Sequence, residues 1–155
     1  MVITTGGPTR PQYADVVQAL TPVLHNLPPK LVALDGWPDV GKTTLGRFLA
    51  WRFNVTLLET DLFLTPRPDD RLVYLNNQIT RIIDDRLQGC FPRPIIVEGI
   101  AVLRLLKKVQ RAPDFVIHVT NRLVLDAGNL IDEMEAYDAE FRPRERADLT
   151  ITLDN

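Results

Sequence analysis

A glycine-rich segment in the first third of the chain reads Gly36-Trp37-Pro38-Asp39-Val40-Gly41-Lys42-Thr43-Thr44. The apolar run 31–34 precedes it, and the helical pattern 45–51 follows it. A glycine, four residues and then Gly-Lys-Thr, placed between a strand and a helix, is the spacing of a phosphate-binding loop, or P-loop. The backbone N–H groups of such a loop and of the helix start form a concave site for anions.

The residue types in the P-loop assign a role to several positions. Gly41 lets the backbone approach a ligand where a side chain would collide with it. Lys42 is expected to reach the β- and γ-phosphates, and the Thr43 hydroxyl is expected to bind Mg²⁺. All nine residues, 36–44, are therefore predicted to bind the nucleotide. The alternative, a tight glycine turn with a solvated lysine, does not explain why Gly, Lys and Thr occur together.

Length and composition are those of an ordinary globular protein. The 155 residues suit one domain, with a lead-in and helix over 1–30 and a core over 31–155. A net charge of −2 provides no general attraction to nucleic acid or to an anionic membrane. The single cysteine, Cys90, excludes an internal disulfide. No secretory signal and no membrane-length apolar run occurs, so we expect a cytoplasmic protein.

Apolar periodicity and turn residues divide the chain into alternating strands and helices. Strands are predicted over 31–35, 55–58, 94–97, 115–119 and 149–153. Helices are predicted over 13–27, 42–52, 71–87, 102–110 and 123–141, with a break over 142–146. An interruption of the last helix near Gly128 stays open. This alternation predicts an α/β fold, in which helices cover both faces of a five-stranded parallel sheet. Pro22 should kink or split the first helix, which either packs on the sheet or binds a partner.

Three acidic residues lie at or just past predicted strand ends: Asp35, Asp61 and Glu98. Ligands of open parallel sheets bind outside the carboxyl ends of the strands. Phosphoryl transfer to an alcohol needs Mg²⁺ and a carboxylate that accepts the hydroxyl proton, and Asp61 and Glu98 could divide these tasks. Asp35 is interpreted as a structural residue that bonds amides of the P-loop. The alternative for Asp61 is a cap or turn residue.

Four segments, in this order, resemble the uridine kinase branch of the P-loop kinases. They are the P-loop itself, then Glu59-Thr60-Asp61-Leu62-Phe63, then Ile96-Val97-Glu98-Gly99-Ile100-Ala101-Val102-Leu103, and finally Tyr137-Asp138-Ala139-Glu140-Phe141-Arg142-Pro143 running into Arg146-Ala147-Asp148-Leu149-Thr150-Ile151. The resemblance implies a P-loop NTPase fold with strand order 2-3-1-4-5. It also implies that Asp61 is the catalytic base and that Glu98 helps to hold Mg²⁺. ATP would phosphorylate a small hydroxylated substrate, with a nucleoside as the leading candidate.

The chain departs from this family at the acceptor region and at the lid. The segment 61–94 is shorter than in uridine kinases and lacks a His-Pro-Asp counterpart. The lid segment 120–135 contains a single arginine, Arg122, whereas family lids bring several to the phosphates. Substrate candidates are Phe63 and Tyr74 for stacking on a ring, Arg67 for an anion, and Arg122.

Two classes of function remain open at this stage: an active small-molecule kinase that uses ATP and Mg²⁺, and a regulatory or degenerate nucleotide-binding module. A GTPase is not favoured, because no Asn-Lys-x-Asp motif occurs. Neither nucleic acid nor a membrane is expected as a partner, and a homodimer stays open. His118 is interpreted as a core residue of the fourth strand.

Overall fold

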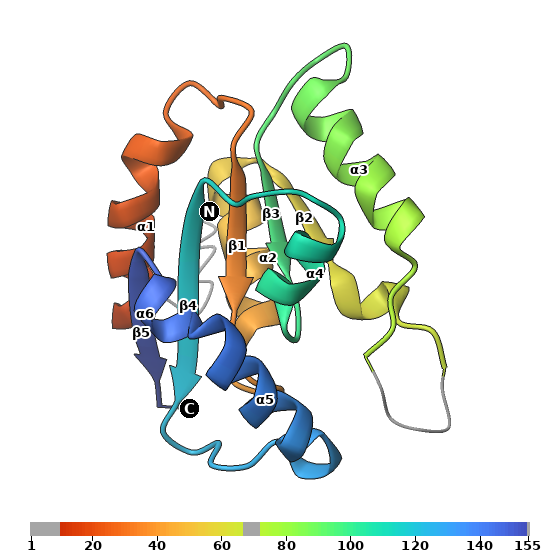
Figure 1. Cartoon of the computed structure of the whole chain (residues 1–155). Coiled ribbons are helices and arrows are strands. Elements are labelled where there is room, and N and C mark those ends of the chain that lie inside the picture. The colour runs from red at the N-terminus through yellow and green to blue at the C-terminus, as the bar shows by residue number, and fades with distance from the viewer. Residues whose placement is uncertain (1–9, 67–71, 155) are drawn as a thin grey trace, which may run out of the picture.

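A computed structural model describes residues 10–66 and 72–154 of the chain. Its parallel strands form one sheet in the order β2-β3-β1-β4-β5 (Figure 1). The strands are β1 Leu31–Asp35, β2 Thr56–Glu59, β3 Ile95–Glu98, β4 Phe115–Asn121 and β5 Leu149–Leu153. The predicted fold class and strand order are confirmed.

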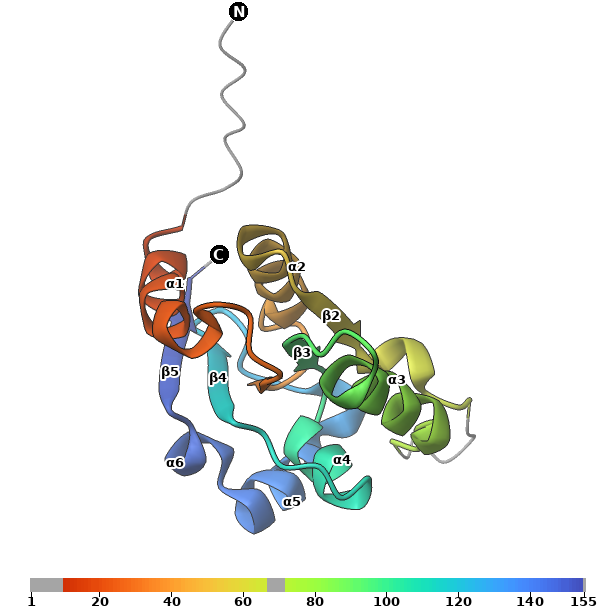
Figure 2. The ribbon, with the colours of Figure 1, turned by 90° about the horizontal axis from the view of Figure 1, so that it is seen from above.

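Helices cover both faces of the sheet (Figure 2). One face packs against α1 Pro11–Leu24 and α2 Lys42–Phe53, and the other packs against α3 Asn76–Gln88, α4 Val102–Lys108 and α5 Ile131–Phe141. The short elements are η1 Thr60–Phe63, η2 Gly128–Leu130 and α6 Pro143–Arg146. No helix in the described ranges is long and apolar enough to cross a membrane.

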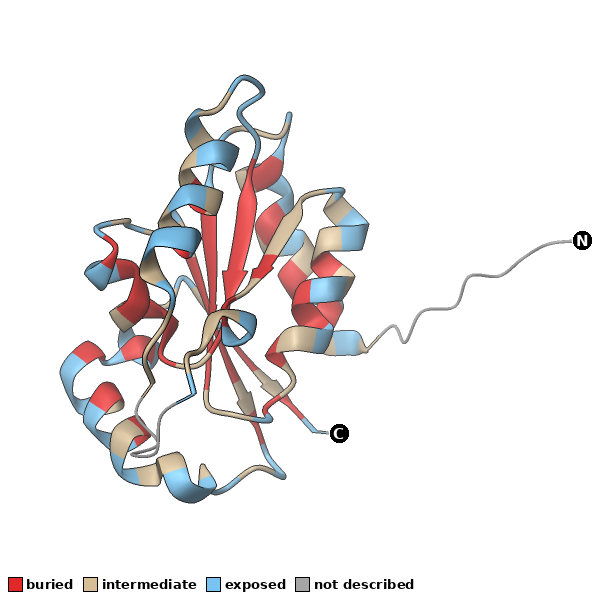
Figure 3. Cartoon of the chain, turned by 90° about the vertical axis from the view of Figure 1, so that its right-hand side faces the viewer, coloured by how far each residue is buried: buried red, intermediate tan, exposed pale blue. Residues whose placement is uncertain are grey.

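Burial of the central strands stabilises the sheet. Every residue of β1 and of β3 is buried, because helices cover both of their faces (Figure 3). The register pairs Leu34 with Glu98 and Asp35 with His118, so these polar groups gather where the strands end. The carboxyl ends of β1, β3 and β4 therefore meet beside the P-loop.

Helix α1 packs on the sheet, which was one of the two predicted alternatives. Tyr13, Val16, Leu20 and Leu24 are its buried side chains. Pro22 lies inside the helix without splitting it, near its end. The helix stops before the predicted boundary at residue 27, since residues 26 and 27 have positive φ angles of 61° and 50°.

Two predicted helices begin later in the structure. The helix expected over 71–87 begins at Asn76, because Tyr74 forms an isolated antiparallel bridge to Leu64 just before it. The helix expected over 123–141 begins at Ile131, after a loop and the short η2. Gly128 in that loop has a φ of 58°, outside the helical region.

The predicted break over 142–146 is also incorrect in part. Arg142 leaves the helix with a left-handed φ of 44°, which ends α5. The next residue, Pro143, starts α6 at a position where a proline is preformed for a helix.

Candidate active site

The P-loop runs from β1 to α2 and is fixed by its glycines. A Cβ on Gly36 would lie 2.3 Å from the Val119 carbonyl oxygen, so only glycine lets the loop pass this close to β4. Gly41 has a φ of 103° and starts α2 without a side-chain cap. Asp39 also has a left-handed φ, 60°, which this residue type tolerates. The uncapped N-terminus of α2 can therefore offer its N–H groups to an anion.

A cavity of about 270 Å³ lies in front of this helix start, and we call it the phosphate cavity. Its lining residues are Pro38, Asp39, Gly41, Lys42, Thr43, Thr44, Asp61 and Ile100. Six of the nine predicted nucleotide-binding residues thus surround one space, together with the predicted base. The other three, Gly36, Trp37 and Val40, do not line it.

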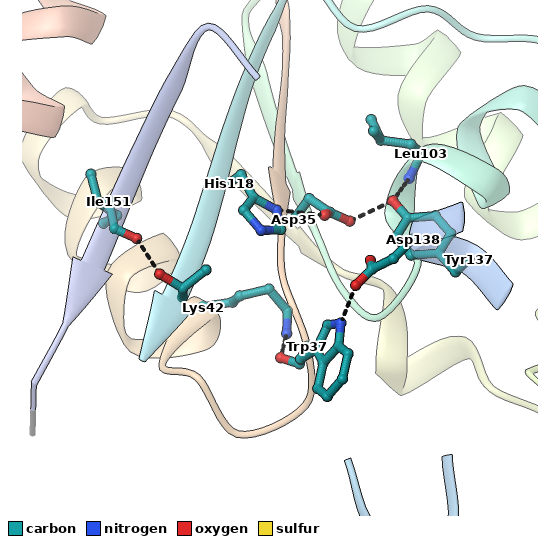
Figure 4. A network of polar contacts seen from close by, with 9 residues as sticks. Asp35, Trp37, Lys42, Leu103, His118, Tyr137, Asp138 and Ile151 are labelled. Atoms are coloured by element: carbon teal, nitrogen blue, oxygen red, sulfur yellow. Dashed lines mark hydrogen bonds and ion pairs between the residues drawn. The ribbon is translucent and has the colours of Figure 1, made fainter. Parts of the chain in front are cut away.

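Lys42 lies at the floor of the phosphate cavity with 5% of its surface exposed. Its Nζ donates a hydrogen bond of 2.5 Å to the carbonyl oxygen of Trp37 (Figure 4). Burial lowers the pKa of Lys42, and the negative charges of Glu98, Asp35, Asp61 and Asp39 act in the opposite direction. The ammonium group thus has an acceptor from its own loop, which a phosphate oxygen could replace.

Thr43 and Glu98 form the predicted metal-binding pair. The Thr43 hydroxyl donates to Glu98 Oε1 over 2.9 Å. The second oxygen, Oε2, is buried and has no hydrogen-bond partner among the described residues. Burial raises the pKa of Glu98, against the opposing effects of the Thr43 hydrogen bond and the Lys42 charge. An unpaired buried carboxylate oxygen beside a hydroxyl is a donor set that suits Mg²⁺.

No cluster of three or more His, Cys, Asp or Glu side chains that could hold a metal occurs in the described part of the chain. A magnesium ion here would therefore depend on Thr43, Glu98 and the phosphates of its nucleotide. Mg²⁺ is commonly held in this way, by one or two protein oxygens plus substrate phosphates and water.

Asp61 lies in η1, across the phosphate cavity from Lys42. Its Oδ1 accepts a long hydrogen bond, 3.5 Å, from the Ile100 backbone N–H. Desolvation of the carboxyl group by the surrounding protein raises the pKa of Asp61, while that hydrogen bond and Lys42 oppose the rise. The residue itself stays exposed, so a substrate hydroxyl can reach it.

Gly99 explains how Asp61 and Glu98 come together. The Thr60 hydroxyl donates to the Glu98 carbonyl oxygen over 3.0 Å, which packs η1 against the end of β3. A Cβ on Gly99 would lie 1.8 Å from Thr60 Oγ1. This close contact explains why a glycine follows Glu98 in the sequence.

Asp35 is a structural residue, as expected, but its partners are side chains of α5 and β4, so the expectation that it bonds amides of the P-loop is wrong. It is fully buried; Oδ1 accepts a 2.7 Å hydrogen bond from the Tyr137 hydroxyl, and Oδ2 lies 3.0 Å from His118 Nδ1 (Figure 4). His118 is a buried sheet residue, as predicted. Asp35 thus ties β1 to β4 and α5, since a buried carboxylate needs such partners.

Trp37 extends this network from the P-loop to α5. Its Nε1–H donates to Asp138 Oδ2 over 2.8 Å. Burial raises the pKa of Asp138, and the Trp37 hydrogen bond opposes the rise. Tyr137 and Asp138 belong to one of the segments that resemble the kinase family, but no local pattern indicates a role for them, because their partners lie about a hundred residues away in the chain.

The four substrate candidates have different surroundings. Phe63 is partly buried against the core, and the Tyr74 hydroxyl donates to the Ile100 carbonyl oxygen over 2.9 Å. Burial raises the pKa of Tyr74. Arg122 is exposed and does not line the phosphate cavity. Arg67 lies outside the described residues.

Among the described residues, Lys42 is the only cation that lines the phosphate cavity. The three arginines that follow α5 are exposed, and Arg142 lies 3.4 Å from Glu145. These arginines do not line the phosphate cavity.

Comparisons with known proteins agree with this geometry. No family model and no curated protein matches the sequence. A structure described as a possible uridine kinase from Bacillus stearothermophilus superposes with a TM-score of 0.71 at 15% identity, covering 94% of this chain and 100% of that one. Shikimate kinase from Acinetobacter baumannii gives a TM-score of 0.50 at 18% identity, covering 84% and 86% of the two chains.

Shikimate kinase from Aquifex aeolicus gives a TM-score of 0.51 at 14% identity, covering 79% of this chain and 85% of the other. At such identities the likeness concerns the fold. The P-loop, the strand order and these superpositions together show that the chain has the fold of the P-loop kinases, in a form similar to that of a uridine kinase-like structure.

Proposed function

We propose that the protein is a small-molecule kinase that transfers the γ-phosphoryl group of Mg-ATP to a hydroxyl group, with a nucleoside or a similar metabolite as acceptor. One observation carries this proposal: Lys42, Thr43 and Asp61 line the same cavity, and Glu98 is bonded to Thr43 at its edge. A phosphate site alone would need no carboxylate on its far side, whereas transfer to an alcohol does.

Each residue has a task in this proposal. The N–H groups of the P-loop and Lys42 hold the phosphates and withdraw charge from the transferred group. Thr43 and Glu98 would hold Mg²⁺, which would neutralise the negative charge that develops on the phosphate oxygens. Asp61 accepts the proton of the acceptor hydroxyl. Burial raises the pKa of Asp61, which makes it a stronger base than an ordinary aspartate.

The test is ADP formation from Mg-ATP, alone and with a panel of nucleosides, sugars and small hydroxylated metabolites. One acceptor should stimulate turnover strongly. Asp61→Asn should lower kcat by about a hundredfold or more while ATP still binds. Lys42→Ala should lose ATP binding. Asp126→Asn, an exposed aspartate in the loop before α5, is the matched control. Stimulated turnover that survives Asp61→Asn would show that the base is another residue.

A second candidate rests on the absence of arginine among the described residues that line the phosphate cavity. A module that binds ATP without efficient transfer needs Lys42 and Thr43 but neither a base nor lid arginines. ATP binding that Lys42→Ala abolishes, combined with no stimulation by any acceptor, would favour such a sensor or degenerate kinase.

A further inference from the structure

A cavity of about 500 Å³ lies between α4, the loop 109–114 and the C-terminal end of α5. Figure 2 shows α4, α5 and α6 along the same side of the sheet, and α6 contributes Arg146 to the lining. We call this space the α4–α5 cavity. Its volume lies in the range that is typical of small-molecule sites.

The α4–α5 cavity is separate from the phosphate cavity. Val116, which lines it, is the second residue of β4, so this cavity lies toward the amino end of that strand. The P-loop lies beyond the carboxyl ends of the strands, and no residue lines both cavities. A molecule in the α4–α5 cavity would therefore contact none of the groups assigned to phosphoryl transfer.

Apolar side chains form the inner wall of the α4–α5 cavity. Leu103, Leu106, Val116 and Phe141 line it, and all four belong to the core on this face of the sheet. An apolar ring or a short alkyl chain that packed against this wall would be removed from water, which is the main driving force for the binding of apolar groups.

The charged groups that line the same cavity are all positive. They are Lys107, Arg111 and Arg146, and no acidic side chain of the described residues joins them. Lys107 Nζ lies 5.3 Å from the centre of the Phe141 ring, and Arg146 Cζ lies 5.9 Å from it. Positive charges from two helices, α4 and α6, are therefore held at one aromatic ring of the inner wall.

Two of the three cations already have acidic partners. Arg111 donates from Nε and Nη2 to the two carboxylate oxygens of Asp84, each over 2.7 Å. Lys107 Nζ lies 3.7 Å from Glu140 Oε1. The guanidinium group of Arg146 contacts the Phe141 ring but forms no ion pair or hydrogen bond with a described residue. One positive charge at the cavity thus lacks a counter-charge.

The acidic residues of the adjoining segments are engaged elsewhere. Asp114 and Asp148 each accept a hydrogen bond of 2.8 Å from a backbone N–H group. Glu145, which precedes Arg146 in the chain, lies 3.4 Å from Arg142. None of the three lines the α4–α5 cavity. An anion that entered it would therefore meet no carboxylate on the described walls.

We propose that the α4–α5 cavity binds a small apolar carboxylate, whose ring or alkyl body packs on the inner wall while its charge pairs with Arg146. A ligand with a single negative charge matches the single cation that lacks a counter-charge. A guanidinium group can hold a planar carboxylate through two parallel hydrogen bonds. Binding at this site does not depend on the proposed kinase activity.

Calorimetry on the full chain with naphthoate as the probe tests the proposal. Naphthoate should bind saturably. The corresponding amide has the same rings without the charge, and it should bind about tenfold more weakly because the charge-assisted hydrogen bonds are lost. Acetate has the charge without the rings, and it should also bind at least about tenfold more weakly. Naphthoate should still bind when Mg-ATP is present in excess.

Two matched pairs of variants locate the site. Arg146→Gln should weaken naphthoate binding about tenfold, whereas Arg144→Gln, in the same short helix but outside the lining, should not. Ala112→Glu places a negative charge at the lining and should weaken binding by a similar factor, whereas Ala139→Glu on α5 should not. All four residues are exposed, so the fold should tolerate the substitutions.

Four results would overturn the proposal. They are the absence of saturable naphthoate binding, equal affinities for naphthoate and its amide, equal effects within either pair of variants, and loss of naphthoate binding in the presence of Mg-ATP. The last result would place the carboxylate at the nucleotide site.

Discussion

The P-loop and the loop that follows β4, residues 122–130, border the same part of the sheet but are held in different ways. The P-loop is pressed against β4 at Gly36 and tied to α5 by Trp37. In the 122–130 loop, Leu123 and Leu125 are 69% and 86% exposed, and nothing lies within 4 Å of a Cβ built on Gly128. The P-loop is thus fixed by packing and hydrogen bonding, whereas the 122–130 loop is open to solvent.

The contrast between packed and open backbone should be largest for stability, in a pair of glycine substitutions, one just after β3 beside the candidate active site and one in the 122–130 loop. Gly99→Ala would place a Cβ 1.8 Å from Thr60 Oγ1, so η1 must move. We expect a loss of about 3 kcal/mol in the free energy of unfolding. Gly128→Ala, in open space, meets only the left-handed backbone penalty of about 1 kcal/mol. Urea unfolding measures both, and equal losses would mean that the contact at Gly99 is relieved without cost.

The next effect concerns Arg122, the only arginine of the segment 120–135. If the loop closes over a bound nucleotide, Arg122 can reach the phosphates, and Arg122→Ala should lower kcat about a hundredfold. Stability should barely change, because the residue is exposed. Arg81→Ala on α3, also exposed, is the control. An unchanged kcat would indicate that this chain transfers phosphate without a lid arginine.

The contrast also explains what could be predicted from the sequence. The P-loop and the positions of the strands follow from local patterns: a glycine spacing, apolar runs and acids at strand ends. The strand order was instead implied by the resemblance to the uridine kinase branch. Asp61, Thr43 and Glu98 could be predicted as residues of one site because each belongs to such a local pattern. The start of α5 at Ile131 was missed, because the apolar residues of 123–130 continue a helical pattern while Gly128 adopts a left-handed φ.

The long-range network was missed for another reason. Asp35 was expected to bond the P-loop, but it pairs with His118 and Tyr137, which are 83 and 102 residues away. No local spacing indicates such partners. Pairings of this kind come from strand register and helix packing, which a single sequence does not specify.

A smaller effect is expected for the bond that joins the P-loop to α5. Trp37→Phe removes the N–H that Asp138 accepts and leaves both carboxylate oxygens unpaired. Unfolding free energy should fall by about 2 kcal/mol. In an Asp138→Ala background the same substitution should cost clearly less, and this double-mutant cycle isolates the hydrogen bond from the lost ring area. Additive effects would show that the bond contributes nothing.

The smallest effect is a pH dependence of stability that comes from the site itself. Burial raises the pKa of Glu98 above its ordinary value of 4.5, so the fold favours the protonated carboxyl group. Its stabilising contribution is fully present below the ordinary pKa and is lost as pH rises through the raised pKa of the folded state. Without nucleotide and Mg²⁺, the melting temperature of Glu98→Gln should therefore fall less than that of the wild type between pH 4.5 and neutral pH.

Asp61 shifts in the same direction as Glu98 but is present in both proteins, so the comparison isolates Glu98. Parallel melting curves would contradict the burial effect. At neutral pH, adding Mg-ATP should raise the melting temperature of the wild type more than that of Glu98→Gln. The ionised Glu98 that destabilises the free protein is the form that can hold Mg²⁺. The cost of keeping this carboxylate unpaired in the free protein is then recovered as affinity for the metal–nucleotide complex, which a glutamine cannot provide.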